Sequence, residues 1–196
     1  LSHGLMERSK SPIFATAAML ILMGVGGRIA LHDYPNFETV MVATFLAAML
    51  LPASTSLIVT ITIMLLSDLY LGYLGSSKII IFTYSGFVMV SLITSRYKKQ
   101  IDTGLNVGSV YKFTASGIIF ALVYDTWTNF GVFWLTYNHT LENLILVYVL
   151  GLPFMLYHLI SSVVTFTLVG FPLYYLLASE VEDAVKHQED NLIRDE

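Results

Sequence analysis

The chain has 196 residues, of which 56% are hydrophobic and 12% are charged, and its mean hydropathy is +0.71. Soluble domains carry about 25% charged residues, so this composition excludes a soluble protein and indicates an integral membrane protein. The absence of cysteine excludes disulfides, thiolate nucleophiles, iron–sulfur clusters and thiolate zinc sites. The net charge of -4 comes mostly from residues 179–196, and we expect no nucleic-acid partner.

Apolar segments predict an all-α bundle of six transmembrane helices, which fills residues 1–178 as one domain, since a span takes about 20 residues. Ser11 and Pro12 are typical of a helix start. The expected helices cover residues 13–31, 38–51, 54–74, 79–95 and 112–135, with a last one inside 144–178. Residues 179–196 form an acidic tail, which we expect to be a short solvated helix or a frayed end.

Two of these segments are irregular. Residues 38–51 are too short to cross a full bilayer, which predicts a re-entrant helix or a locally thinned membrane. The last segment contains Gly151, Pro153, Gly170 and Pro172, so we expect an external or re-entrant stretch up to about Met155 and the sixth span after it.

The distribution of basic residues predicts the orientation. With six spans and both termini cytoplasmic, the cytoplasmic side holds most of the lysines and arginines, as the positive-inside rule requires. A five-span alternative, in which the second and third segments fuse, weakens this bias. The cytoplasmic set is Arg8, Lys10, Arg96, Lys98, Lys99, Lys112, Lys186 and Arg194, whereas Arg28 and Lys78 lie on the other side. We expect the cell membrane as the location.

Ionisable residues inside the apolar segments are the first candidates for a site, because a charge in hydrocarbon is costly and usually functional. At 1.5 Å of rise per residue, Arg28, Asp68 and Asp125 each lie roughly 20 Å from the cytoplasmic end of their helices. They therefore share one level in the outer third of the membrane. Four further polar residues are expected at or just above that level, namely Asn36, Glu38, Asn129 and His158.

Two interpretations of this polar level stay open. Arg28 can pair with Asp68 or Asp125 only to lower the insertion cost and lock the bundle. Alternatively, the polar side chains line a water-accessible solute pocket, because one arginine cannot satisfy two aspartates. His158 by itself is typical of a packed interfacial histidine, and the aromatic residues Tyr70, Tyr73, Trp127, Trp134, Tyr137 and Tyr157 are typical of an interfacial belt.

The sequence shows no catalytic or metal-binding motif. The five histidines have no HExxH spacing, no serine lies in GxSxG, and the aspartates do not form paired catalytic motifs. We therefore expect neither an enzyme nor a metal or cofactor site. Asn138 begins an N-x-T sequon in the loop that we expect to be external.

Four stretches carry a resemblance to known proteins: RIALHDYPNFETV, MLLSDLYLGY, WTNFGVFW and LPFMLYHLISSVV, between residues 12 and 178. In this order and spacing the chain resembles small uncharacterised prokaryotic membrane proteins that look related to the substrate-binding S components of energy-coupling-factor transporters. SDLYLG and TNFG are the most specific parts. The resemblance implies six helices that capture a small molecule such as a vitamin at the outer side.

The same resemblance implies docking on a transmembrane coupling subunit that two ATPases drive. Small residues near the start of the first helix, Ala15, Ala17 and Ala18, are the candidates for that contact, but the fourth residue after each is large. The partner can therefore be a different membrane complex. Two functions follow: a solute-binding subunit of a transporter, or a non-catalytic structural or assembly subunit of a larger membrane complex.

Overall fold

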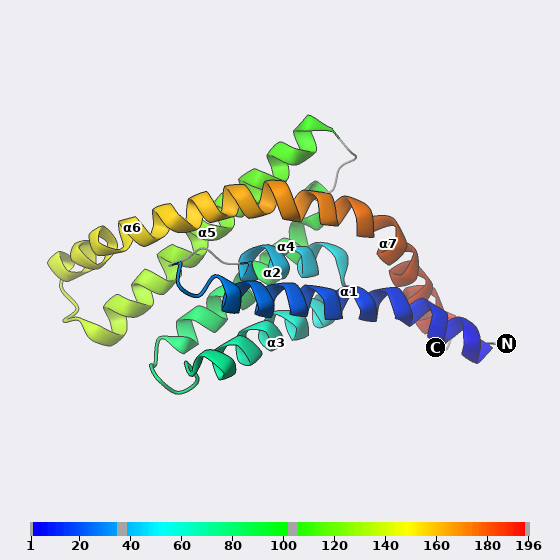
Figure 1. The fold of residues 1–196 in the computed structure, drawn as a ribbon, viewed down its shortest axis with the longest axis horizontal. Coiled ribbons are helices and arrows are strands. Elements are labelled where there is room, and N and C mark those ends of the chain that lie inside the picture. Colours follow the sequence, from blue (N-terminus) through cyan, green and yellow to red (C-terminus); the bar gives the residue numbers. More distant parts are fainter. Residues whose placement is uncertain (1, 35–38, 102–105, 195–196) are drawn as a thin grey trace.

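The computed structural model describes residues 2–34, 39–101 and 106–194, and the side chains from Pro12 to Lys186 within these ranges. The described chain is almost entirely helical (Figure 1). Its elements are α1 (Ser2–Ala30), α2 (Val40–Leu50), α3 (Ala53–Leu71), α4 (Ile80–Ile101), α5 (Val107–Thr136), α6 (Leu141–Thr165), the π-helix η1 (Phe166–Gly170) and α7 (Phe171–Arg194).

Among the described residues, five helical stretches are long and apolar enough to cross a membrane. They are Pro12–Ala30, Ala53–Leu71, Ile80–Ile101, Val107–Thr136 and Leu141–Lys186, and a shorter apolar helix covers Val40–Leu50. An apolar helix satisfies its own backbone groups, which is why such segments fold as helices in lipid. The prediction of an all-helical, multi-pass membrane protein is confirmed at this level.

The short helix α2 is the centre of the bundle. All eleven of its residues are buried, and it packs against every other helical element. At 1.5 Å per residue it is only about 16 Å long, roughly half of the hydrocarbon thickness. Its surroundings are protein rather than lipid, so a half-length helix can lie inside the membrane without exposing its ends to hydrocarbon.

Close packing against α1 sets where α2 begins. The Thr39 hydroxyl, at the N-cap of α2, donates a 2.8 Å hydrogen bond to the Met23 carbonyl of α1. A Cβ atom on Gly27 would collide with the Thr39 side chain, whereas one on Gly26 would meet nothing within 4 Å. Only glycine at position 27 allows this approach. It places the start of α2 beside the residue that follows, Arg28.

The helical structure of residues 141–194 differs from the prediction. Helices α6, η1 and α7 follow one another without a loop from Leu141 to Arg194, and Figure 1 shows them as one long bent element. The expected break between an external or re-entrant segment and the last span near Met155 is therefore wrong, since Pro153 lies inside α6. Lipid offers no partner for a backbone that leaves the helix, so an apolar segment stays helical around its proline.

The π-helix marks where this element bends. The Phe171 N–H bonds back five residues to the Phe166 carbonyl, and the next residue, Pro172, has no N–H to donate. Phe166 lies in the aromatic core, with its ring centre 5.0 Å from that of Phe45 on α2. A Cβ atom on Gly117 of α5 would lie 2.5 Å from the Phe166 ring, so glycine makes room for it.

The ends of the chain also differ in detail from the prediction. Helix α1 begins at Ser2 and contains Pro12, so the expected helix start at Ser11 is wrong. At the other end, α7 runs on to Arg194, and Val181 and Ala184 are buried. In Figure 1 both ends of the chain lie at one end of the bundle, and the α3–α4 and α5–α6 connections lie at the other.

Candidate functional site: a polar cavity inside the bundle

An ion pair joins the last turns of α1 and α3. The Arg28 Nη2 atom lies 2.8 Å from Oδ1 of Asp68, whose side chain is almost fully buried. The Nη1 atom donates to the Ser67 hydroxyl at 2.8 Å and contacts the Met64 sulfur at 3.5 Å. The Tyr84 hydroxyl of α4 is close enough to Asp68 to interact with it, although it makes no hydrogen bond of good geometry. Asp68 of α3 thus neutralises the charge of Arg28.

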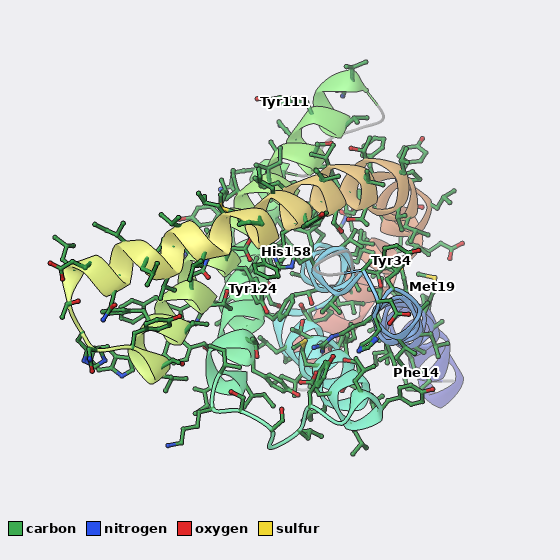
Figure 2. All side chains as sticks on the ribbon, turned by 60° about the vertical axis from the view of Figure 1, so that its left-hand side comes forward. Phe14, Met19, Tyr34, Tyr111, Tyr124 and His158 are labelled. Atoms are coloured by element: carbon green, nitrogen blue, oxygen red, sulfur yellow. The ribbon has the colours of Figure 1, made fainter. Side chains whose placement is uncertain are left out.

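A second pair joins α5 to α6. The Nδ1 atom of His158 lies 2.6 Å from Oδ1 of Asp125, and each residue is only 5% exposed. The edge of the Tyr124 ring packs against the imidazole at a centroid distance of 5.8 Å, and Figure 2 shows both residues inside the bundle. The other carboxylate oxygen of Asp125, Oδ2, is buried and has no hydrogen-bond partner among the described residues.

These groups surround a cavity of about 360 Å³ between α1, α4, α5 and α6. Four residues that the sequence analysis singled out line it together, and aromatic and small residues complete the wall. The lining residues are Arg28, Thr83, Phe87, Tyr124, Asp125, Thr128, Asn129, Gly151, Phe154 and His158. Asp68 is absent from this lining and reaches the cavity only through Arg28.

The position of Asn129 depends on a glycine. A Cβ atom on Gly151 of α6 would lie 2.6 Å from the Asn129 amide nitrogen and 2.7 Å from its oxygen. Asn129 follows Asp125 by four residues on α5, so both side chains lie on one face of that helix. Because Gly151 has no side chain, the Asn129 amide fits between α5 and α6.

The remaining predicted site residues fall elsewhere. Asn36 and Glu38 lie outside the described residues. Of the three alanines proposed for docking, Ala17 is buried in the core, so it is covered by the protein itself, whereas Ala15 is exposed and Ala18 is half-buried.

The aromatic residues at this end have different environments. The Trp127 indole donates a 2.9 Å hydrogen bond to the Ser85 hydroxyl, so it packs inward against α4. Trp134 stacks on His139 at a centroid distance of 4.4 Å near the α5–α6 connection. Tyr70 and Tyr157 are exposed, as an interfacial belt requires.

The sequence analysis missed the contribution of α4. Thr83 and Phe87 line the cavity, and Tyr84 lies beside Asp68. A signal was present, since Thr83, Tyr84 and Ser85 form a polar triplet early in an otherwise apolar segment. It was not recognised because none of these residues carries a charge.

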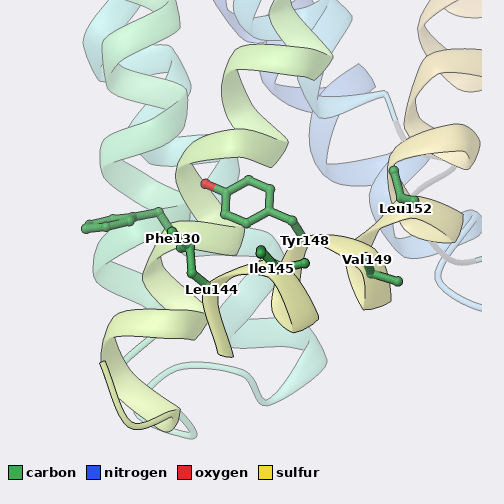
Figure 3. A pocket seen from close by; sticks show the side chains of 6 residues that line it. All are labelled: Phe130, Leu144, Ile145, Tyr148, Val149 and Leu152. Atoms are coloured by element: carbon green, nitrogen blue, oxygen red, sulfur yellow. The ribbon is translucent and has the colours of Figure 1, made fainter. Parts of the chain in front are cut away.

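Two further hollows lie on the outward face of the α5–α6 pair. Figure 3 shows the first, which is lined by Phe130, Leu144, Ile145, Tyr148, Val149 and Leu152. The second shares Phe130 and Tyr148 with it. The one hydroxyl lining the first, on Tyr148, donates a 2.8 Å hydrogen bond to the Thr126 carbonyl. These apolar hollows suit contact with lipid tails.

Metal coordination has little support in the described ranges. No group of three or more histidine, aspartate or glutamate residues in that part of the chain could hold a metal ion. One histidine and two aspartates take part in the two ion pairs of the spanning helices. They belong to different pairs, since Asp68 pairs with Arg28 and His158 pairs with Asp125. The arrangement is one of hydrogen-bond donors and acceptors around an aromatic-walled space.

Apolar spanning helices around an internal polar cavity define a multi-pass helical membrane protein. The chain belongs to the Family of unknown function (DUF6580), whose model matches residues 8–185. No curated protein and no solved structure matches the chain significantly.

Proposed function

We propose that this protein is a membrane-embedded solute-binding subunit of a transporter, similar to an S component, which captures a small molecule from the outer side of the cell membrane. The observation that supports the proposal best is the cavity of about 360 Å³ inside an apolar bundle. Small-molecule sites typically have volumes of about 300–1,000 Å³ and a few polar groups that fix orientation. The proposal includes six passes, with α2 as a half-length one, and both termini in the cytoplasm.

A purely structural role accounts for less of the geometry. The two pairs would suffice to lower the insertion cost of Arg28 and Asp68 and of Asp125 and His158. They do not require an open space beside them, and they leave Asn129 facing that space. A partly open hollow lined by a few polar and aromatic side chains is what a small-molecule site typically has.

The second candidate function is a structural or assembly subunit of a larger membrane complex. It is favoured by the way each pair ties two helices together, α1 to α3 and α5 to α6. The proposed coupling partner, a transmembrane subunit with ATPases or another membrane complex, would have to contact Ala15 and Ala18 without the buried Ala17.

Ligand-dependent thermal stability separates the two functions. The purified protein is heated with vitamins, amino acids, amines and metal ions, one at a time. A ligand at a hundredfold excess over its Kd stabilises the folded state by about 2.7 kcal/mol, which raises the melting temperature. A response to at least one compound is expected.

A matched pair of substitutions locates that response. Thr83→Phe fills the cavity without changing charge and should abolish the stabilisation, whereas Thr126→Phe on the exposed side of α5 should preserve it. Both variants must first show wild-type melting without ligand. If no compound stabilises the wild type, or if Thr83→Phe responds normally, the assembly function is favoured.

A further inference from the structure

We propose that the cavity takes an organic cation: a small molecule with one protonated amine or quaternary ammonium group beside an aromatic or apolar body. The inference rests on the proposed solute-binding function and names the chemical class of the solute. Its starting point is the carboxylate of Asp125, which lines the cavity while its Oδ2 atom has no hydrogen-bond partner in the described part of the chain.

The two aspartates of the ion pairs have different partners. Arg28 is paired with Asp68 at 2.8 Å, so these two charges cancel. The partner of Asp125 is an imidazole whose Nδ1 atom lies 2.6 Å from Oδ1, and the second carboxylate oxygen, Oδ2, has no hydrogen-bond partner among the described residues. A charge held in a water-poor environment favours a counter-charge nearby. A ligand ammonium group meets this requirement, and its N–H groups can supply the donor that Oδ2 lacks.

The walls of the cavity suit the same class of ligand. Phe87 of α4, Tyr124 of α5 and Phe154 of α6 contribute aromatic rings from three helices. The Phe87 and Tyr124 ring centres are 4.5 Å apart, so they form a continuous aromatic surface next to Asp125. Cations are attracted to aromatic faces, and aromatic walls with a carboxylate are a common way to bind organic cations. Asn129 and Thr128 add hydrogen-bonding groups for the rest of the molecule.

Two other classes fit the cavity less well. An anion would need a cation that is not already neutralised, but both terminal nitrogens of Arg28 face partners on α3. A divalent metal ion usually needs three or more protein ligands, and no group of three acidic or histidine residues exists among the described residues. A single carboxylate with aromatic neighbours is sufficient for an ammonium group.

Four small probes of similar size test the charge preference directly. Benzylamine and choline are the cations, benzyl alcohol is the neutral compound and benzoate is the anion. Each is titrated against the protein in lipid nanodiscs while the melting temperature is recorded. The two cations should raise the melting temperature in a saturable way, and benzyl alcohol and benzoate should not.

Asp125→Asn keeps the shape of the side chain and an acceptor for His158 but removes the charge. We expect it to weaken cation binding at least tenfold, with a melting temperature in the absence of probe that shows a folded protein. Asp33→Asn removes an exposed carboxylate outside the cavity and should leave cation binding unchanged.

Different results contradict different claims. If neutral or anionic compounds from the wider screen bind in the cavity and cations do not, the cation inference is wrong while solute binding stands. Equal cation binding by wild type and Asp125→Asn also overturns the inference. If neither the probes nor any screened compound stabilises the protein, both proposals fail.

Discussion

At the scale of single residues, the free-energy cost of a charge inside the membrane depends on the partner that neutralises it. Arg28 and Asp68 cancel each other across α1 and α3, and the Ser67 hydroxyl takes a further N–H of the guanidinium. Ser67 also donates to the Ile63 carbonyl at 2.7 Å, so its orientation is fixed within its own helix. The pair is therefore held from both sides, and its main effect should appear when only one partner is removed.

We predict that Arg28→Met lowers the free energy of unfolding by about 3 kcal/mol, because it leaves the buried Asp68 carboxylate without its counter-charge. The double variant Arg28→Met with Asp68→Leu should recover most of this loss, since an apolar pair has no desolvation cost. Unfolding in mixed detergent micelles gives both values. A double variant that is less stable than the single one would show that Asp68 has stabilising contacts independent of Arg28.

At the scale of elements, the described side chains near the end of α7 divide into buried and exposed ones. Val181 and Ala184 are buried with 1% and 5% exposure, whereas Glu182 and Lys186 form an exposed i,i+4 pair at 2.8 Å. The helix packs against α1, so its buried side covers the first helix. Exposed i,i+4 pairs contribute little to stability, so burial decides which residues matter.

Two truncations test this division. Deleting the residues after Lys186 should leave the melting temperature and ligand response unchanged. Deleting from Ser179 onward removes the buried Val181 and Ala184 and should cost about 2–3 kcal/mol of stability, mostly through lost apolar burial. If the shorter truncation also destabilised the protein, the segment after Lys186 would have a role that the described side chains do not show.

At the scale of the whole molecule, one central half-length helix organises the bundle. Because α2 is surrounded by all the other elements, the apolar faces of the long helices meet around it. Its N-cap residue, Thr39, packs against Gly27 and donates to the Met23 carbonyl of α1, which fixes where this central helix begins. We infer that a full-length second helix would compete for the space that the cavity occupies.

The proposed topology can be measured because the chain has no native cysteine. Single cysteines at the exposed positions Lys78, Lys99 and His139 report on three connections. With both termini cytoplasmic, an impermeant thiol reagent added to intact cells should label positions 78 and 139, and label position 99 only after the membrane is opened. Labelling of position 99 from outside, with 78 and 139 protected, would reverse the orientation.

The sequence by itself determined the class of fold. Hydropathy and segment length are enough to predict apolar helices, because lipid leaves the backbone no alternative to internal hydrogen bonds. The same rule explains the error near Met155: glycine and proline end helices in water, but here the helix continues past Pro153. Helical rise alone also predicted one level for Arg28, Asp68 and Asp125, because the rise per residue follows from covalent geometry.

Only the tertiary structure decided which charges pair and what lies between them. Depth along a helix does not fix rotation about its axis or the choice of neighbouring helix, so the sequence left Arg28 free to pair with either aspartate. Packing resolved this through small residues: Gly27 positions α2, and Gly151 admits Asn129. These contacts put His158 against Asp125 and Asp68 against Arg28, and leave the cavity between α1, α4, α5 and α6. Such contacts join residues far apart in the chain, and no local pattern encodes them.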